Sequence, residues 1–388
     1  MVRVRPGWDG LRRGCNAAQR RGRRLAAAVR RRAGRLLLVG VLITIGLASS
    51  AAGEEYAFVA TSGGRFTLDG GPARLAGLNV WNANENPQSR RDCGTPPDLS
   101  AAGSEFGPGM RAVRIWYFQR LATTADGVRD WTTFDNTLHA AAMNHLRVIA
   151  VLGNQWADCE GYDSAQAGYK TDQWYREGYW RDHPPGQPAS YLEWAREVVG
   201  RYRNDPTIML WQLVNEPEDS VALGGSCPSD ASEVLRAFVR HVGQQIKAID
   251  PRHLLGMGTV GSGQCGTSGG EYVDLNADQY IDVADYHDYS LDVVPGDQWN
   301  GLATRAREMS ELGKPLIIGE MGVIPSQVGG VQARAALIGS KIYADFQLGV
   351  QGALLWAWRP AALGGTNPDG YDIGPGDPVL DQLTSLTS

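Results

Sequence analysis

The stretch IMLWQLVNEPE, residues 208–218, decides the fold of this chain. It begins with an almost unbroken apolar run in which Gln212 is the single interruption. Such a run is typical of a strand that is covered on both faces, as in a parallel sheet. Asn215 and Glu216 follow directly, and Pro217 then ends the run because it has no backbone N–H. The pattern predicts a buried strand with polar side chains at its C-terminal tip.

Similar apolar runs recur along the chain, and segments with helical periodicity separate most of them. The eight predicted strands are Arg74–Trp81, Ala112–Phe118, Arg147–Leu152, Ile208–Asn215, Leu254–Val260, Val283–Tyr289, Leu316–Met321 and Gly352–Trp358. The clearest predicted helices are Trp131–His145, Tyr191–Tyr202, Ala231–Ile249, Trp299–Leu312 and Val331–Leu348. This alternation predicts an α/β protein with a parallel sheet. Because no G-x-G-x-x-G motif follows the first strand, eight such units favour a closed (β/α)8 TIM barrel over an open doubly wound sheet.

The segment ahead of the first barrel strand has turn chemistry of its own. Phe58–Leu75 contains the sequence Asp-Gly-Gly between two short runs that suit strands. Glycine after aspartate is typical of tight hairpin turns. We therefore expect a small N-terminal β-hairpin before the barrel.

The beginning of the chain differs in composition from the rest. Residues 1–52 hold twelve of the 37 basic residues and one of the 42 acidic ones, with an apolar run at residues 36–47 and small residues after it. This order predicts a secretory signal peptide; a twin-arginine signal at residues 31–32, a retained anchor and a mis-assigned start codon are the alternatives. The apolar run is short for a membrane span, which needs about 20 residues. We expect residues 53–388 to form a single exported domain.

Charge and cysteine content agree with export. Without residues 1–52 the formal charge is near −16, which disfavours a nucleic-acid partner because phosphate binding needs a basic surface. Four cysteines remain, none with the C-x-x-C spacing of a metal site, and an even number in an exported domain favours disulfides. Of the three possible pairings we expect Cys93 with Cys159 and Cys227 with Cys265.

Two glutamates stand at predicted strand tips, where a parallel barrel gathers its functional groups. Glu216 closes the fourth strand and Glu320 closes the seventh, within LIIGEMG. Either one alone could be a helix cap or a buried partner of Arg114. Together they face each other across the barrel mouth, as the hydrolysis of a glycosidic bond requires.

Five tip motifs resemble those of the retaining glycoside hydrolases of family 5, in clan A, and the resemblance spans almost all of residues 53–388. The motifs are W-Q-L-V-N-E-P at 211–217, V-R-I-W at 113–116, H-D-Y at 287–289, I-G-E-M-G at 318–322 and L-W-A-W at 355–358. The resemblance implies a catalytic (β/α)8 domain that cleaves β-linked sugars by double displacement. Glu216 would be the general acid and then the base, and Glu320 the nucleophile.

The resemblance also implies roles for neighbouring side chains. Asn215 would bind the sugar 2-hydroxyl, and His287 would hydrogen-bond near the acid/base or the sugar. Arg114 and Tyr289 would contact the nucleophile and keep it ionised. The reaction needs one neutral and one anionic carboxyl, so we expect a raised pKa at Glu216. A retaining enzyme should hold its carboxyl groups about 5 to 5.5 Å apart, against roughly 6.5 to 9.5 Å in an inverting one.

Aromatic residues suggest how a sugar could be held. The loop at 154–187 is too long for a simple connection and contains seven Trp and Tyr residues, about half of which we expect to pack inside the loop. Flat aromatic faces suit the C–H faces of sugar rings. Trp356 is the predicted platform at the point of cleavage, and Asn154 is a further predicted substrate contact. Weaker platform candidates are Trp81, Trp116, Trp156 and Trp299.

The substrate is less constrained than the reaction. R-I-W at 114–116 and N-Q-W at 154–156 look closest to the β-mannanase branch of family 5, but Glu218 stands where many mannanases place Arg. β-Mannan is therefore the first expectation and β-glucan the next, with an exo-acting glycosidase on a glycoconjugate as an alternative. A catalytically silent sugar-binding barrel is the rival from another class; such a protein would not need to retain both glutamates.

The remaining expectations concern partners and location. Metal-dependent hydrolysis would require clusters of His and Asp at the strand tips, and only His287 is found there, so we expect no metal or cofactor. We expect a monomer with a carbohydrate substrate, secreted or associated with the cell wall. Contact with a membrane is expected only if the N-terminal segment is retained.

Overall fold

The computed structural model describes residues 57–85, 93–104, 110–359, 367 and 369–384. The chain divides into Met1–Gly53, which lies outside the described residues, and Glu54–Ser388. The predicted signal peptide or anchor and the boundary after residue 52 therefore stay predictions. Within the described ranges, no helix is both long and apolar enough to cross a membrane.

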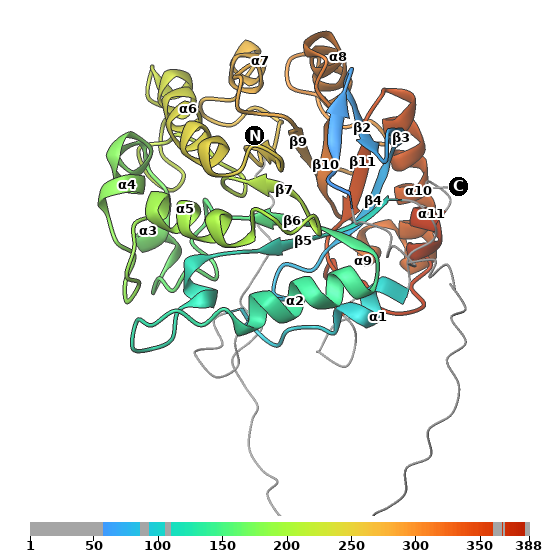
Figure 1. Cartoon of the computed structure of the whole chain (residues 1–388). Helices are drawn as coiled ribbons and strands as arrows, with labels where there is room; N and C mark the ends of the chain where they lie inside the picture. Colours follow the sequence, from blue (N-terminus) through green and yellow to red (C-terminus); the bar gives the residue numbers. More distant parts are fainter. Residues whose placement is uncertain (1–56, 86–92, 105–109, 360–366, 368, 385–388) are drawn as a thin grey trace, which may run out of the picture. The chain divides into compact units, whose positions relative to one another are not determined.

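Eight parallel strands form one sheet whose order in space is β8-β7-β6-β5-β4-β11-β10-β9 (Figure 1). The strands are β4 (Leu75–Asn79), β5 (Met110–Trp116), β6 (Leu146–Val151), β7 (Ile208–Gln212), β8 (Leu254–Gly256), β9 (Ala284–Asp288), β10 (Leu316–Met321) and β11 (Gly352–Leu355). A parallel bridge between Gly256 and Val283 joins the two end strands. The sheet therefore closes on itself, and the predicted (β/α)8 barrel is confirmed.

The junction of β8 with β9 is the thinnest part of this barrel, because β8 has three residues whereas β5 has seven. Here the backbone carbonyl of Asp285 accepts hydrogen bonds from the hydroxyls of Thr259 at 3.0 Å and Tyr272 at 2.9 Å. The backbone N–H of His287 donates to the carbonyl of Val260 at 3.0 Å. Side-chain hydroxyls thus supplement a short backbone ladder at this junction.

Helices follow most of the strands and cover the outside of the barrel (Figure 1). The longer ones are α2 (Thr132–Met143), α5 (Tyr191–Tyr202), α6 (Ala231–Ile249), α8 (Leu302–Leu312) and α10 (Val331–Gln347). The shorter ones are α1 (Leu99–Ser104), α3 (Ala165–Gly168), α4 (Tyr179–Arg181), α7 (Gly270–Asn276), α9 (Pro325–Val328) and α11 (Leu380–Thr384), with a 3-10 turn at Gln119–Ala122 and a π-helical turn at Trp174–Gly178.

The predicted helix at Trp299–Leu312 begins three residues late, and the cause is local. The carboxylate of Asp297 accepts the backbone N–H groups of Trp299 at 2.8 Å and Asn300 at 2.7 Å. Such a turn competes with helix formation and delays the first helical residue to Leu302. By contrast, α5 has the predicted bounds, since Ser190 and Glu193 form a capping box at its start.

The N-terminal segment forms a three-stranded antiparallel sheet rather than the single hairpin we predicted. Its strands are β1 (Ala60–Ser62), β2 (Arg65–Leu68) and β3 (Gly71–Ala73). The first turn, Gly63-Gly64, and the second, Asp69-Gly70, both have positive φ at their two central residues. That conformation matches the twist of paired strands, so each dipeptide makes a tight hairpin.

Apolar side chains fill the N-terminal end of the barrel. One buried cluster joins the first residues of the strands, including Leu75, Leu254 and Ile317, with Val59 and Phe66 from the N-terminal segment. A larger cluster lies between the barrel and its helices. The C-terminal ends of the strands are thereby left for polar side chains.

Both predicted disulfides are present, each with a Cα–Cα distance of 5.2 Å. Cys93–Cys159 ties the segment after β4 to the loop after β6, and Cys227–Cys265 ties the loop after β7 to the loop after β8. Each bridge therefore joins loops that follow C-terminal strand ends, on the face where a barrel carries its functional site.

Candidate active site

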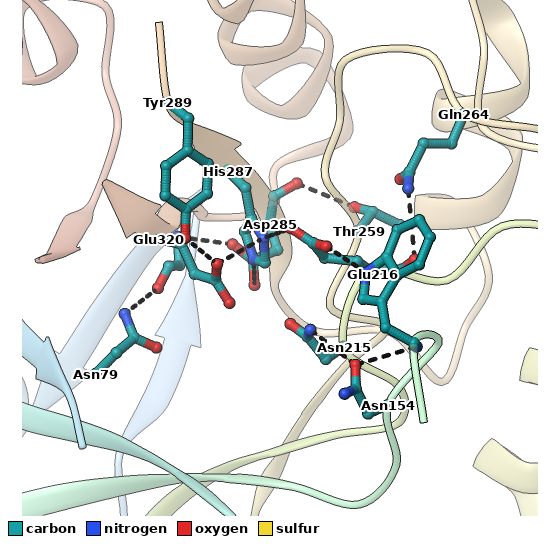
Figure 2. A network of polar contacts seen from close by, with 12 residues as sticks. Asn79, Asn154, Asn215, Glu216, Thr259, Gln264, Asp285, His287, Tyr289 and Glu320 are labelled. Atoms are coloured by element: carbon teal, nitrogen blue, oxygen red, sulfur yellow. Dashed lines mark hydrogen bonds and ion pairs between the residues drawn. The ribbon is translucent and has the colours of Figure 1, made fainter. Parts of the chain in front are cut away.

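The predicted site residues converge at the C-terminal end of the barrel. Because parallel strands all end on the same side, residues far apart in the sequence become neighbours there. Figure 2 shows His287 between Glu216 and Glu320, with Tyr289, Asn215 and other polar residues around them. One oxygen of each glutamate and one nitrogen of His287 all lie within 4.8 Å of one another.

Glu320 is buried and held by a cation and a phenol. Arg114 Nη1 lies 2.6 Å from its Oε1, and the hydroxyl of Tyr289 donates to its Oε2. Arg114 is itself fully buried, and its other donors reach Gln212 Oε1 at 2.7 Å, Asn215 Oδ1 at 2.7 Å and Asn79 Oδ1 at 3.2 Å. The guanidinium is therefore well satisfied by fixed acceptors, and the predicted contacts to Glu320 are present.

Glu216 has a different set of partners. His287 Nδ1 lies 2.8 Å from its Oε1, and the indole N–H of Trp156 donates to its Oε2 at 2.5 Å. The backbone of Glu216 has a φ of 54°, which is unusual for a residue other than glycine. Such conformations cluster at functional sites, where the surrounding structure holds them in place.

His287 links the two glutamates and has a third acidic neighbour. Its Nδ1 is 3.5 Å from Glu320 Oε2, and its Nε2 is 3.7 Å from Asp285 Oδ2. Burial lowers the pKa of His287, but Glu320, Asp285 and Glu216 outweigh burial and raise that pKa to about 10. The ring is therefore an imidazolium at neutral pH.

The expectation of a raised pKa at Glu216 is wrong. Burial raises the pKa of Glu216, but the hydrogen bond and charge of His287, followed by the Trp156 hydrogen bond, bring that pKa below its ordinary value. Burial raises the pKa of Glu320, against the opposing charges of His287 and Arg114. The reason is that N–H donors face both oxygens of Glu216, which favours its anionic form.

The two asparagines at neighbouring strand tips orient each other. Asn215 Nδ2 donates to Asn154 Oδ1 at 3.1 Å, while Asn215 Oδ1 accepts from Arg114. The amide of Asn154 in turn donates to the carbonyl of Asp158 at 3.3 Å. Both side chains therefore have fixed directions beside Glu216.

The tryptophans differ in how much ring they expose. Trp356 is half-buried, follows β11 and precedes a cis peptide bond to Ala357. Trp116 is 3% exposed; it stacks on Phe118 at 5.2 Å, and the Arg114 guanidinium lies 4.9 Å from its ring centre. Trp81 is also buried, so these two form the wall behind the site and do not present an open face.

The remaining aromatics divide as expected between loop packing and exposure. In the loop at 154–187, Tyr169, Tyr175 and Tyr179 are buried, whereas Trp180 is exposed. Trp299 lies outside that loop and is 65% exposed. Of the weaker platform candidates, Trp156 is the one that touches a catalytic candidate, through its bond to Glu216.

Sequence reasoning did not identify Asp285 or the contact role of Gln212. Gln212 joins Arg114 to Asp285, because its Oε1 accepts from Arg114 and its Nε2 donates to Asp285 Oδ2. The available signal was a polar residue inside an apolar strand: Gln212 interrupts Ile208–Val214, and Asp285 lies within the predicted strand Val283–Tyr289.

Among the described residues, one group could hold a metal ion, and it is Glu216, His287 and Glu320 themselves. A metal ion there would lie close to the positive guanidinium of Arg114, whose Nη1 is 2.6 Å from Glu320 Oε1. It would also compete with the imidazolium of His287 for the two carboxylates. Because Arg114 and His287 are both positively charged, they attract the two carboxylates and repel a divalent cation.

Comparison with known proteins agrees with this geometry. A family model described as Cellulase (glycosyl hydrolase family 5) matches residues 106–358. The chain belongs to glycosyl hydrolase family 5. The predicted membership is thus confirmed, and with it the prediction of an O-glycosyl hydrolase at the level of the family.

Individual relatives in family 5 cover most of the chain. Probable mannan endo-1,4-beta-mannosidase C of Aspergillus terreus is 29% identical and aligns with 71% of this chain and 76% of its own length. Mannan endo-1,4-beta-mannosidase 8 of Oryza sativa subsp. japonica is 27% identical, with coverages of 79% and 88%. The solved structure of an endo-1,4-beta-mannanase from Rhizomucor miehei matches with a TM-score of 0.65 and 22% identity, covering 85% of this chain and 98% of that one. At that identity the structural likeness shows the shared fold alone.

Proposed function

We propose that this chain is a secreted, endo-acting, retaining hydrolase of β-1,4-linked mannan. The observation that carries the proposal is the pair of carboxylates at the barrel mouth, Glu320 buried and Glu216 partly buried, with oxygens within 4.8 Å of each other. That separation supports a retaining mechanism, for which about 5 to 5.5 Å is typical, rather than an inverting one at roughly 6.5 to 9.5 Å.

In the first step, Glu320 attacks the anomeric carbon while the bond to the leaving oxygen breaks. Arg114 and Tyr289 fix the direction of the attacking carboxylate. Glu216 gives a proton to the leaving oxygen, and a glycosyl-enzyme ester remains on Glu320. In the second step, Glu216 accepts a proton from water as that water attacks the same carbon and frees Glu320.

The neighbouring side chains would hold the sugar at the point of cleavage. Asn215 sits beside Glu216 with its amide oriented by Arg114 and Asn154, which suits a hydrogen bond to the 2-hydroxyl. Trp356 offers part of its ring as a platform. Trp116 would act indirectly, because it packs behind Trp356 with ring centres 6.1 Å apart.

Mannan is the preferred substrate because the relatives that align with most of this chain are named as endo-1,4-beta-mannosidases. β-Glucan is the second candidate. It is favoured by the description of the family model, Cellulase, and by the acidic residue after N-E-P. Glu218 is buried and accepts a hydrogen bond from the hydroxyl of Tyr169, so it forms part of the loop packing. A silent sugar-binding barrel is disfavoured, since it would not need Arg114 and Tyr289 on Glu320.

The disulfides and the net charge support the proposed location and the proposed class of substrate. Two disulfides suit an oxidising compartment, which agrees with secretion. The acidic charge of residues 53–388 suits an uncharged carbohydrate better than a nucleic acid. A monomeric state stays a prediction.

The reaction and the substrate can be tested separately. Products formed from β-mannan, β-glucan and xylan, with the anomer formed first identified by proton NMR, would identify the sugar and the stereochemical course. For the nucleophile, Glu320→Ala should abolish turnover of an activated aryl β-mannoside, and azide should restore it with an α-glycosyl azide as product. The exposed Glu311→Ala is the matched control. Undiminished turnover by Glu320→Ala would refute the assignment.

A further inference from the structure

Tyr289 contacts the proposed nucleophile from a position just outside the barrel sheet. Its hydroxyl donates to Glu320 Oε2, but strand β9 ends at Asp288 and strand β10 beside it ends at Met321. Backbone pairing between the two chains reaches as far as the N–H of Gly322, which donates to the carbonyl of Asp288 at 3.0 Å. Because Tyr289 lies one residue beyond that carbonyl, other contacts must set the direction in which its side chain leaves the sheet.

The contacts of the Tyr289 ring are apolar. A Cβ atom at Gly322 would lie 2.6 Å from Tyr289 Cε1, so the ring lies directly over this glycine. The ring of Tyr371 meets it edge to face, with ring centres 5.1 Å apart. Such contacts confine the plane of the ring, but each is weak, and they do not hold the hydroxyl at one point. The distance from that hydroxyl to Glu320 therefore depends on the backbone around residue 289.

A lysine from α10 holds the chain on both sides of Tyr289. Lys341 is fully buried, and its Nζ lies 2.9 Å from Asp288 Oδ2. The same ammonium group donates to the carbonyl of Ser290 at 3.1 Å and to the carbonyl of Asp292. Asp288 Oδ1 also accepts the backbone N–H of Ser290 at 3.0 Å. Since a buried ammonium group must stay close to its acceptors, residues before and after Tyr289 are fixed to one point on α10.

We propose, building on the proposed function, that Lys341 is a positioning residue for the nucleophile: it holds residues 288–292 so that the hydroxyl of Tyr289 stays on Glu320. Arg114 bonds the other oxygen, Oε1, so the two contacts together set the plane of the carboxylate. Attack on the anomeric carbon depends on that alignment, and a displacement of about 1 Å can slow a reaction about 10²-fold. Lys341 thus influences the reaction without touching the sugar.

Lys341 could instead serve stability alone, because its charge also acts on the buried Asp345. Lys247 provides a matched control at the opposite end of β9. Its Nζ lies 2.6 Å from Asp282 Oδ2 and donates to the carbonyl of His253 at 2.7 Å, so it too joins an ion pair with a backbone contact. Asp282 precedes β9, at the end of the barrel away from the glutamates. Lys247→Met should therefore reduce stability and leave the reaction unchanged.

The kinetic test compares Lys341→Met, Tyr289→Phe and the double variant on a 2,4-dinitrophenyl β-mannoside. Each single change should lower kcat/KM by about ten-fold or more. The double variant should be no slower than Tyr289→Phe, because both changes remove the same hydrogen bond. The acidic limb of kcat/KM should move to higher pH in all three, since a carboxylate that loses a donor is protonated more readily. Losses that multiply in the double variant, or an acidic limb that Lys341→Met shares with Lys247→Met, would overturn the proposal.

A second variant keeps the test independent of the folding of Lys341→Met, which leaves the charge of Asp288 buried and unpaired. Lys341→Met combined with Asp288→Asn removes the ion pair as a neutral unit and keeps an acceptor for the N–H of Ser290. This variant should show the same loss, and Tyr289→Phe added to it should be no slower than Tyr289→Phe alone. Undiminished kcat/KM would overturn the role of Lys341 and leave the proposed function intact. Absence of glycosidase activity in the unaltered protein would refute both.

Discussion

At the scale of single residues, the two glutamates show how surroundings give one side chain two roles. Glu320 faces a guanidinium and a phenol, and Glu216 faces an imidazolium and an indole N–H. The first set suits the proposed nucleophile, because it fixes the direction of the carboxylate and favours its anionic form. The second set directs two N–H donors at the proposed acid/base, so that the two carboxyl groups lie in different surroundings.

This difference predicts the behaviour of Glu216→Gln. Glutamine cannot deliver a proton, so turnover of mannan should fall about 10² to 10⁴-fold. A 2,4-dinitrophenyl β-mannoside should still form the intermediate, and azide should then give a β-glycosyl azide because the intermediate is trapped without a base. The measurement is product analysis beside pre-steady-state release of dinitrophenolate, with Glu311→Gln as control. Equal losses on both substrates would argue against the acid/base role.

The site residues that motifs predicted and those that they missed differ in how they act. Glu216, Glu320 and Arg114 stand at strand ends within recognisable motifs, so the sequence was sufficient to bring them together. Asp285 and Gln212 act across strands, and their meeting depends on register and on the space left by Gly319. The charge on His287 could not be read from the sequence either, because it results from three carboxylates that converge only in the fold.

At the scale of elements, α10 places two charged residues, Lys341 and Asp345, in the protein interior near β9. Lys341 Nζ lies 2.9 Å from Asp288 Oδ2 and donates to the backbone carbonyls of Ser290 and Asp292, which fixes the loop after β9. Asp345, one turn further along α10, is fully buried and has no hydrogen-bond partner for its carboxylate within the described residues. Burial, then the charge of Asp288, raises the pKa of Asp345 to about 8 against the opposing charge of Lys341.

Asp345 should therefore make stability depend on pH. Its pKa in the folded state is about 8 and the ordinary value is 3.8, so between these values the folded state holds a proton that the unfolded state releases. Stability should fall as pH rises through this window. Asp345→Asn should remove that loss, worth up to about 6 kcal/mol at 1.36 kcal/mol per pKa unit. Urea unfolding at pH 5 and pH 8 measures it, beside Asp274→Asn; an unchanged pH slope would contradict the prediction.

Element prediction succeeded where periodicity was long and failed where elements were short. α5 and α6 have the predicted bounds, since 12 and 19 residues give a clear apolar stripe. α1 and α7, with six and seven residues, carry too few turns for such a signal. Strand β8 ends at Gly256 rather than Val260, because the backbone turns away where Gly258 has a positive φ of 90°.

At the scale of the whole molecule, the order of apolar runs was sufficient to predict the barrel and the face that carries its site. A sheet of eight parallel strands has one closed arrangement that buries every strand, so strand count and alternation largely decide the topology. The shape of the cleft was not predictable. It depends on the loop at 154–187, whose Trp156 reaches Glu216 through packing that no local pattern encodes.

The whole reaction is assigned to carboxyl groups, so removal of divalent ions should leave activity unchanged. We expect the same rate on mannan after exhaustive dialysis against EDTA. Added Zn²⁺ should inhibit, because Glu216, His287 and Glu320 are close enough to bind it and would then be unable to act on the sugar. Loss of activity in EDTA that Zn²⁺ or Mn²⁺ restores would show that the reaction depends on a metal.

The junction between β8 and β9 has a consequence for motion. A short backbone ladder, which includes the bond from His287 N–H to the carbonyl of Val260, and two side-chain hydroxyl groups hold the barrel together where β9 carries His287. If the barrel opens locally, we expect the β8–β9 junction to separate first. Amide protons there should then exchange with solvent sooner than those of β5 or β6. Each such opening would move His287 away from Glu216, so the lifetime of their hydrogen bond should be limited by how often this junction separates.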